Sequence, residues 1–124
     1  MFITIEPNSQ TPIYLQLRRQ IVEGIVRGEL RPGDPLPSVR QMAVDMGINL
    51  HTVNKAYGVL QAEGFVEIFG RRGARVAPAP PRYDEAFLAE LRGQLQALYR
   101  EARSRGVEGE LFAALLQEAL REAP

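Results

Sequence analysis

Two apolar stripes separated by a glycine constrain what residues 36–63 can fold into. The first stripe has the spacing i, i+3, i+4, i+7 and consists of Val39, Met42, Ala43 and Met46. The second has the same spacing and consists of Val53, Ala56, Tyr57 and Leu60. This spacing puts apolar side chains on one face of a helix. Ser38 and Asn49 precede the stripes as expected N-caps, and Gly47 and Gly64 follow them as helix ends. The segment therefore predicts two amphipathic helices joined by a tight turn.

The face of the second helix that the stripe leaves free is polar. It holds His51, Thr52, Asn54 and Lys55 near the start of the helix. A second helix of this kind, braced by the first across a tight turn, is typical of a helix-turn-helix, in which it lies in the major groove of DNA. We therefore expect these side chains to face DNA.

The flanking segments complete a small domain. Thr11 is expected to cap a helix whose first residue is Pro12, with apolar residues at i+4 spacing: Ile13, Leu17, Ile21 and Ile25. A rigid turn, LRPGDPLP, follows at residues 30–37. Downstream, FVEIF and ARVA flank the turn GRRG and predict a β-hairpin wing with Arg71 and Arg72 at its tip. The expected fold is mainly α with a small β-hairpin: a winged helix-turn-helix over residues 1–76.

A proline-rich linker at residues 77–83 leads to two further amphipathic helices within residues 84–124. The apolar residues that we select from these helices as dimerisation residues are Phe87, Leu91, Leu95, Leu98, Phe112, Leu115 and Leu116. Two helices of this length present more apolar surface than they can hide in each other, which favours a partner contact. A second copy of the chain, related by a twofold axis, is the simplest partner. Packing of the tail on the winged helix of the same chain is the alternative.

Taken together, the first helix, the turn RPGDPLPSVRQMA, the segment GINLHTVNKAYGVLQAEGFVE and the wing RRGARVA resemble the winged helix-turn-helix of GntR-family bacterial transcription regulators. The short tail resembles the YtrA-like branch of that family. The resemblance implies a repressor with DNA contacts from the turn, the recognition helix and the wing tip. The candidate DNA-binding residues are Ser38, Arg40, Leu50, His51, Thr52, Asn54, Lys55, Gly70, Arg71 and Arg72. Many relatives have arginine where Leu50 and Asn54 stand.

The net charge of zero is unusual for a chain that neutralises phosphates. Residues 1–76 hold nine Lys or Arg against seven Asp or Glu, whereas residues 77–124 hold six against eight. The basic residues of the segments expected to face DNA are Arg40, Lys55, Arg71, Arg72 and Arg75. This modest positive surface predicts that affinity depends on two copies binding together, on an inverted-repeat operator in double-stranded DNA.

The sequence lacks the residues that disulfide-bonded, membrane-spanning and catalytic proteins require. There is no cysteine and no apolar run of about 18 residues, so neither a disulfide framework nor a membrane span is expected, and the cytoplasm is the expected location. His51 is the only histidine, and no serine pairs with it in a recognisable catalytic pattern. We expect no enzyme, no metal site and no cofactor.

Several alternatives stay open at this point. A winged-helix module for protein–protein assembly without DNA contact is the second class of function. For Arg40 the alternative role is a surface ion pair with Asp45 or another nearby acid, and for Tyr57 it is stacking on a base. No motif indicates a small-molecule effector, and an apolar pocket at the junction of tail and winged helix stays an open alternative.

Overall fold

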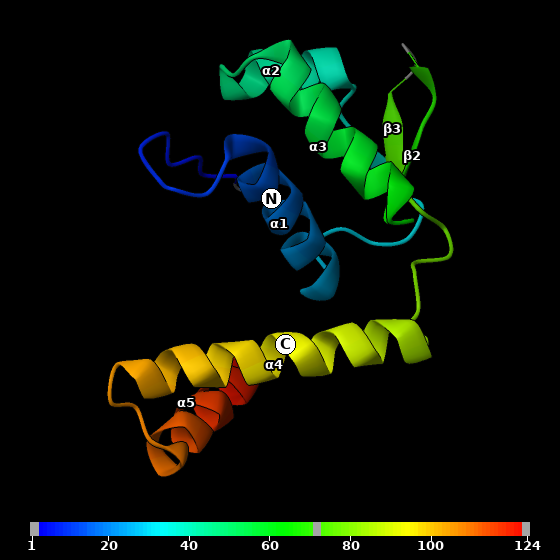
Figure 1. The fold of residues 1–124 in the computed structure, drawn as a ribbon. Coiled ribbons are helices and arrows are strands. Elements are labelled where there is room, and N and C mark those ends of the chain that lie inside the picture. The colour runs from blue at the N-terminus through cyan, green and yellow to red at the C-terminus, as the bar shows by residue number, and fades with distance from the viewer. Residues whose placement is uncertain (1–2, 71–72, 123–124) are drawn as a thin grey trace. The chain divides into compact units, whose positions relative to one another are not determined.

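A computed structural model describes residues 3–70 and 73–122 of the chain. The chain divides into two compact units between Pro81 and Arg82. The elements are α1 (Ile13–Val26), β1 (Pro35–Leu36), α2 (Val39–Met46), α3 (Leu50–Ala62), β2 (Val66–Ile68), β3 (Ala74–Val76), α4 (Glu85–Ser104) and α5 (Gly109–Glu122), as Figure 1 shows. The expectation of a mainly helical fold with a small wing is confirmed.

Helix α3 is the centre of the first unit, and both α1 and α2 pack against it. The four residues of its predicted stripe, Val53, Ala56, Tyr57 and Leu60, have no exposed surface. Leu17 and Ile21 of α1 and Met42 and Ala43 of α2 complete this core from the facing helices. Because the apolar face of α3 is used in this way, its polar face is left at the surface.

The ends of α2 and α3 follow the predicted caps. The Ser38 hydroxyl accepts a hydrogen bond from the Gln41 N–H (3.1 Å), and the Asn49 side chain accepts one from the His51 N–H (2.7 Å). Gly47 ends α2 in the left-handed conformation, with φ of 65°. That backbone conformation suits glycine and turns the chain directly into α3.

The predicted start of α1 is wrong by one residue. Thr11 is not the cap, because α1 begins at Ile13 and Pro12 stands at the N-cap position without a side-chain hydrogen bond. Proline has a fixed φ that suits the helix entry, and its carbonyl accepts hydrogen bonds from the N–H groups of Leu15 and Gln16. The Thr11 carbonyl instead accepts a hydrogen bond from the side chain of Gln16.

The predicted hairpin is present, but it belongs to a three-stranded antiparallel sheet of order β1-β3-β2. The turn segment LRPGDPLP contributes the short strand β1, which pairs Pro35 with Arg75 and Leu36 with Ala74. Proline is tolerated in an edge strand, and a strand of two residues leaves no periodicity in the sequence. The sheet ties the turn before α2 to the wing.

The second unit is a helical hairpin of α4 and α5. The Asp84 side chain caps α4 by accepting a hydrogen bond from the Phe87 N–H at 2.8 Å. Tyr99 of α4 meets Phe112 of α5 edge-on, with 5.1 Å between ring centroids and 67° between the planes. None of the described side chains of the two helices is buried. Apart from this contact, most large apolar side chains of the hairpin are exposed.

Candidate nucleic-acid interface

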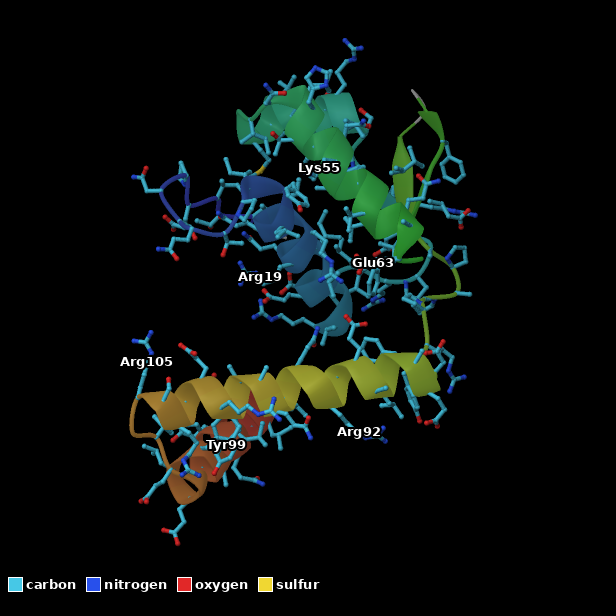
Figure 2. The ribbon with its side chains drawn as sticks, in the orientation of Figure 1. Arg19, Lys55, Glu63, Arg92, Tyr99 and Arg105 are labelled. Atoms are coloured by element: carbon cyan, nitrogen blue, oxygen red, sulfur yellow. The ribbon has the colours of Figure 1, made fainter. Side chains whose placement is uncertain are left out.

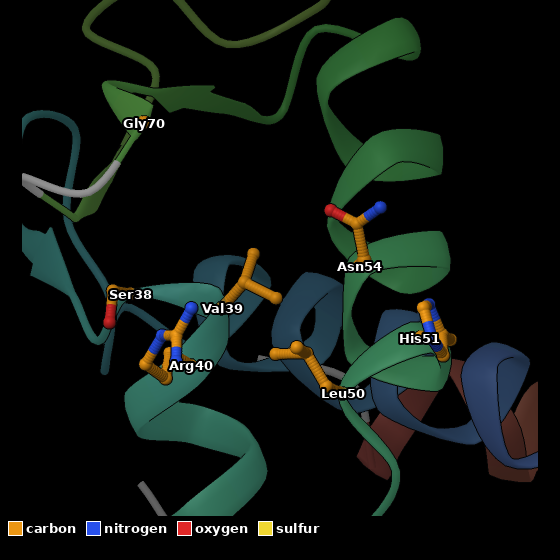
Figure 3. A pocket seen from close by; sticks show the side chains of 7 residues that line it. All are labelled: Ser38, Val39, Arg40, Leu50, His51, Asn54 and Gly70. Carbon is orange, nitrogen blue, oxygen red and sulfur yellow. The ribbon is translucent and has the colours of Figure 1, made fainter.

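An open cleft of about 730 Å³ lies between the start of α2, the start of α3 and the end of the wing strand β2. Its lining consists of Ser38, Val39, Arg40, Leu50, His51, Asn54 and Gly70, all shown in Figure 3. Six of the ten candidate DNA-binding residues thus meet in one place, although they come from three segments of the chain. Val39 is the lining residue that sequence reasoning missed.

The cleft is formed at the N-terminal ends of two helices. Ser38 caps α2, and Val39 and Arg40 are the first two residues of that helix. Leu50 and His51 are the first two residues of α3, and Asn54 stands one turn further along. Helix N-termini carry partial positive charge and favour anions such as phosphate. The arrangement therefore combines two positive helix ends, a cation and an amide on one surface.

Arg40 is exposed, and it has no ion-pair partner among the described residues. Asp45, the acid considered as its alternative partner, accepts a hydrogen bond from the Gln41 side chain at 2.6 Å. The guanidinium of Arg40 is thus not neutralised by Asp45, and its five N–H donors suit a phosphate or a guanine.

Two candidates on α3 lie outside the lining of the cleft. Thr52 is half-buried. The Lys55 ammonium lies 4.1 Å from the centre of the Tyr14 ring of α1, a cation–π contact, and Figure 2 labels this residue on α3. Arg71 and Arg72, the remaining two candidates, lie outside the described residues.

Arg75 is among the basic residues expected to face DNA, but its guanidinium has partners within the wing. Its guanidinium lies 3.2 Å from both carboxylate oxygens of Glu67 and 5.2 Å from the centre of the Phe69 ring. The opposite charge of Glu67 on the neighbouring strand offsets that of Arg75. The sequence does not predict the pair of Arg75 and Glu67, because the pair depends on the register of β2 against β3.

Tyr57 does not stack on a base, so that alternative is wrong. The ring is fully buried, and its hydroxyl donates a hydrogen bond to the Pro37 carbonyl at 2.8 Å. Burial raises the pKa of this phenol well above its ordinary value near 10. Tyr57 therefore supports the turn behind the cleft as a neutral side chain.

Within residues 3–70 and 73–122, no three His, Cys, Asp or Glu side chains lie together as a metal site would require. In the same ranges no helix is long and apolar enough to cross a membrane.

The model of the gntR family, described as bacterial regulatory proteins, matches residues 13–76. The chain belongs to the GntR family. The match spans α1 to β3, including the whole described part of the cleft. Because this is a family of regulators, the expectation that the chain is not an enzyme is confirmed.

Two YtrA proteins extend the comparison beyond the winged helix-turn-helix. The HTH-type transcriptional repressor YtrA of Bacillus subtilis is 38% identical over 117 residues, which cover 94% of this chain and 90% of that protein. The structure of YtrA from Sulfolobus acidocaldarius, described as a GntR-family transcription factor, is 37% identical, with a TM-score of 0.57 and coverage of 97% of both chains. The likeness to the YtrA-like branch includes the tail and is confirmed.

The third comparison is with a domain bound to DNA. The structure of the AraR DNA-binding domain in complex with operator ORX1 matches with a TM-score of 0.53 and 28% identity, covering 60% of this chain and 92% of that one. Together with the family match, it establishes this GntR-family chain as a DNA-binding transcription regulator.

Proposed function

We propose that this GntR-family regulator is a dimeric repressor that binds an inverted-repeat operator through the cleft between α2, α3 and the wing. The observation that supports the proposal most directly is the convergence of Arg40, His51 and Asn54 on one open surface at the start of α3. A recognition helix contacts base edges with its N-terminal residues. The Bacillus subtilis relative is named a transcriptional repressor, which supports repression rather than activation.

The side chains of the cleft divide into two kinds of contact. Arg40, at the second position of α2, suits the phosphate backbone, as do Arg71 and Arg72 at the expected wing tip. Asn54 and His51 suit base edges, because an asparagine amide pairs with adenine through two hydrogen bonds. Lys55 lies outside the lining of the cleft, with its ammonium over the Tyr14 ring, and its charge adds affinity for any sequence. Binding of this kind takes place on double-stranded DNA in the cytoplasm, and it needs no cofactor.

Dimerisation is assigned to the tail. Its large apolar side chains are exposed, including Phe87 at 52%, Leu98 at 58% and Leu115 at 48%. The other members of the proposed face are Leu91, Leu95 and Leu116. Phe112 uses part of its surface on Tyr99 within the same chain, so it closes the hairpin as well as bordering this face. Burial against a second copy contributes about 1.5–3 kcal/mol for each fully buried large side chain.

The proposal is tested by selecting binding sites for the full-length protein from random duplex DNA and by footprinting the selected site. A dimer predicts an inverted repeat whose half-sites are separated by about one helical turn or a multiple of it. Transcription from a promoter that overlaps the site should fall when the protein is added. Recovery of no preferred sequence, or of binding that disappears completely at moderate salt, would favour the assembly module without DNA recognition.

A further inference from the structure

The start of the recognition helix presents an apolar side chain to the cleft. Leu50, the first residue of α3, is 40% exposed and lines the cleft together with Val39, the first residue of α2. Figure 3 shows the Leu50 side chain extending from α3 toward the start of α2, with the Val39 side chain extending into the same opening. We infer that Leu50 and Val39 form a contact surface for the C5-methyl group of a thymine in the operator.

The two residues have different relations to the core. Val39 is half-buried and packs against the core with part of its side chain, so its position is firmly held. Leu50 does not belong to the apolar side chains that pack against this core in the described part of the chain. Leu50 is exposed in the free protein and lies where base edges would enter. Burial of its side chain therefore contributes favourable free energy only when DNA is bound.

The major groove offers one apolar group to such a surface. Adenine, guanine and cytosine present hydrogen-bond donors and acceptors there, whereas thymine adds its C5-methyl group. Leu50 and Val39 have no polar side-chain atoms and cannot satisfy a donor or an acceptor, so a G·C pair beneath them would lose its hydration without compensation. The surface therefore selects a T·A pair over the other pairs. This assignment rests on the proposed function, because it requires the cleft to face the groove.

Deoxyuridine tests the inference, because it differs from thymidine in the groove only by the missing methyl group. Each thymine of the selected operator is replaced in turn by uracil, and the affinity is measured by fluorescence anisotropy at constant salt. Burial of one methyl group is worth about 0.8 kcal/mol, so the wild-type protein should bind about fourfold more weakly for each half-site substituted at the contacted position. At that position Leu50→Ala should lose most of this difference between the thymine and uracil operators, with Val39 keeping the remainder.

Variants on the same helices provide matched controls. Val44 of α2 is 72% exposed and does not line the cleft, so Val44→Ala should keep the full uracil effect. Leu50→Met keeps an apolar side chain and should keep most of the effect. Unchanged helical content and unfolding temperature for Leu50→Ala would establish that the fold is intact, as its exposure predicts.

The outcomes separate the inference from the proposed function. A selected operator that tolerates uracil at every thymine would overturn the inference alone. Retention of the full uracil effect by Leu50→Ala would overturn it as well, because the methyl group would then act on DNA shape or on another residue. Failure to select any operator would instead overturn the proposed function, and the inference with it.

Discussion

At the scale of single residues, Tyr57 links the core to the segment that positions the cleft. Its ring is buried between the helices of the first unit, and its hydroxyl bonds to the carbonyl of Pro37, the residue before the Ser38 cap. This hydrogen bond is part-buried, and removing the hydroxyl would leave its acceptor without this donor. One side chain thus couples the stability of the core to the geometry of the start of α2.

Tyr57→Phe should lower the free energy of unfolding by about 0.5–1.5 kcal/mol at pH 7 in urea titrations. The raised pKa of the folded phenol adds a pH dependence. Because the unfolded phenol loses its proton at lower pH than the folded one, this stabilisation is present below about pH 10 and is lost as the pH rises further. Wild-type protein should therefore lose stability more steeply above pH 10 than Tyr57→Phe. Tyr83→Phe, at an exposed position, is the matched control, and identical alkaline slopes for wild type and Tyr57→Phe would contradict the assignment.

Neighbouring residues on α3 should separate specificity from general affinity. Asn54 lines the cleft, whereas the Lys55 ammonium lies over Tyr14. Asn54→Ala should relax the preference at one base position, a loss of about 1–3 kcal/mol of discrimination, and Lys55→Ala should weaken binding to all sequences nearly equally. Site selection with each variant measures this difference. Recovery of the wild-type motif by Asn54→Ala would show that the amide does not contact a base.

At the scale of elements, the turn between α2 and α3 sets the angle at which the recognition helix leaves its support. Gly47 adopts a φ of 65°, and a Cβ atom built on it would meet no heavy atom within 4 Å. Any penalty for a side chain at this position is therefore one of backbone conformation rather than of space.

Gly47→Ala should lower the stability of the protein by about 1–2 kcal/mol, because an L-residue in the left-handed region carries that penalty. Gly58→Ala is the matched control, for which we expect a change in stability of the opposite sign. Gly58 lies inside α3 in open space without a positive φ, so alanine there should raise stability by about 0.5–1 kcal/mol. Thermal unfolding of both variants measures the two effects. Equal shifts of the same sign would contradict the role given to the turn.

At the scale of the whole molecule, the unit that contains the cleft is built without the tail helices. Its core residues, from Leu17 to Ala77, all precede Pro81. Ala77 is itself buried, and its N–H donates a hydrogen bond to the Phe65 carbonyl at 2.9 Å. A fragment that ends at Pro81 therefore keeps every residue of this core, whereas one that ends at Val76 would lose the Ala77 contact.

The fragment 1–81 should fold, sediment as a monomer and bind the selected operator much more weakly than the full chain, because a monomer contacts one half-site. Leu95→Glu in the full-length protein should also sediment as a monomer, since it puts a charge on the proposed dimer face. Gln96→Glu adds the same charge next to it, outside the proposed dimer face, and should leave the dimer intact. Dimers of both the fragment and Leu95→Glu would move the interface into the winged helix.

The sequence by itself determined the helices and most of their ends. The stripes of α2 and α3, the caps Ser38 and Asn49 and the turn at Gly47 are all encoded within a few residues, because helix periodicity and capping act over one or two turns. The same local reasoning named Ser38, His51 and Asn54 among the residues that line the cleft, and the resemblance to the GntR family added Arg40, Leu50 and Gly70. It placed the start of α1 one residue too early, since Pro12 can stand either inside or just before a helix.

Only the tertiary structure decided which distant segments meet. The pairing of Pro35 with Arg75 joins residues forty positions apart and makes a strand of a segment expected to be a turn. The positions of Val39 in the cleft, of the Lys55 ammonium over Tyr14 and of Arg75 beside Glu67 likewise depend on the packing of separate elements. Local patterns specify which face of an element is apolar, but the partner that covers it and the side chains brought beside it depend on contacts between residues far apart in the chain.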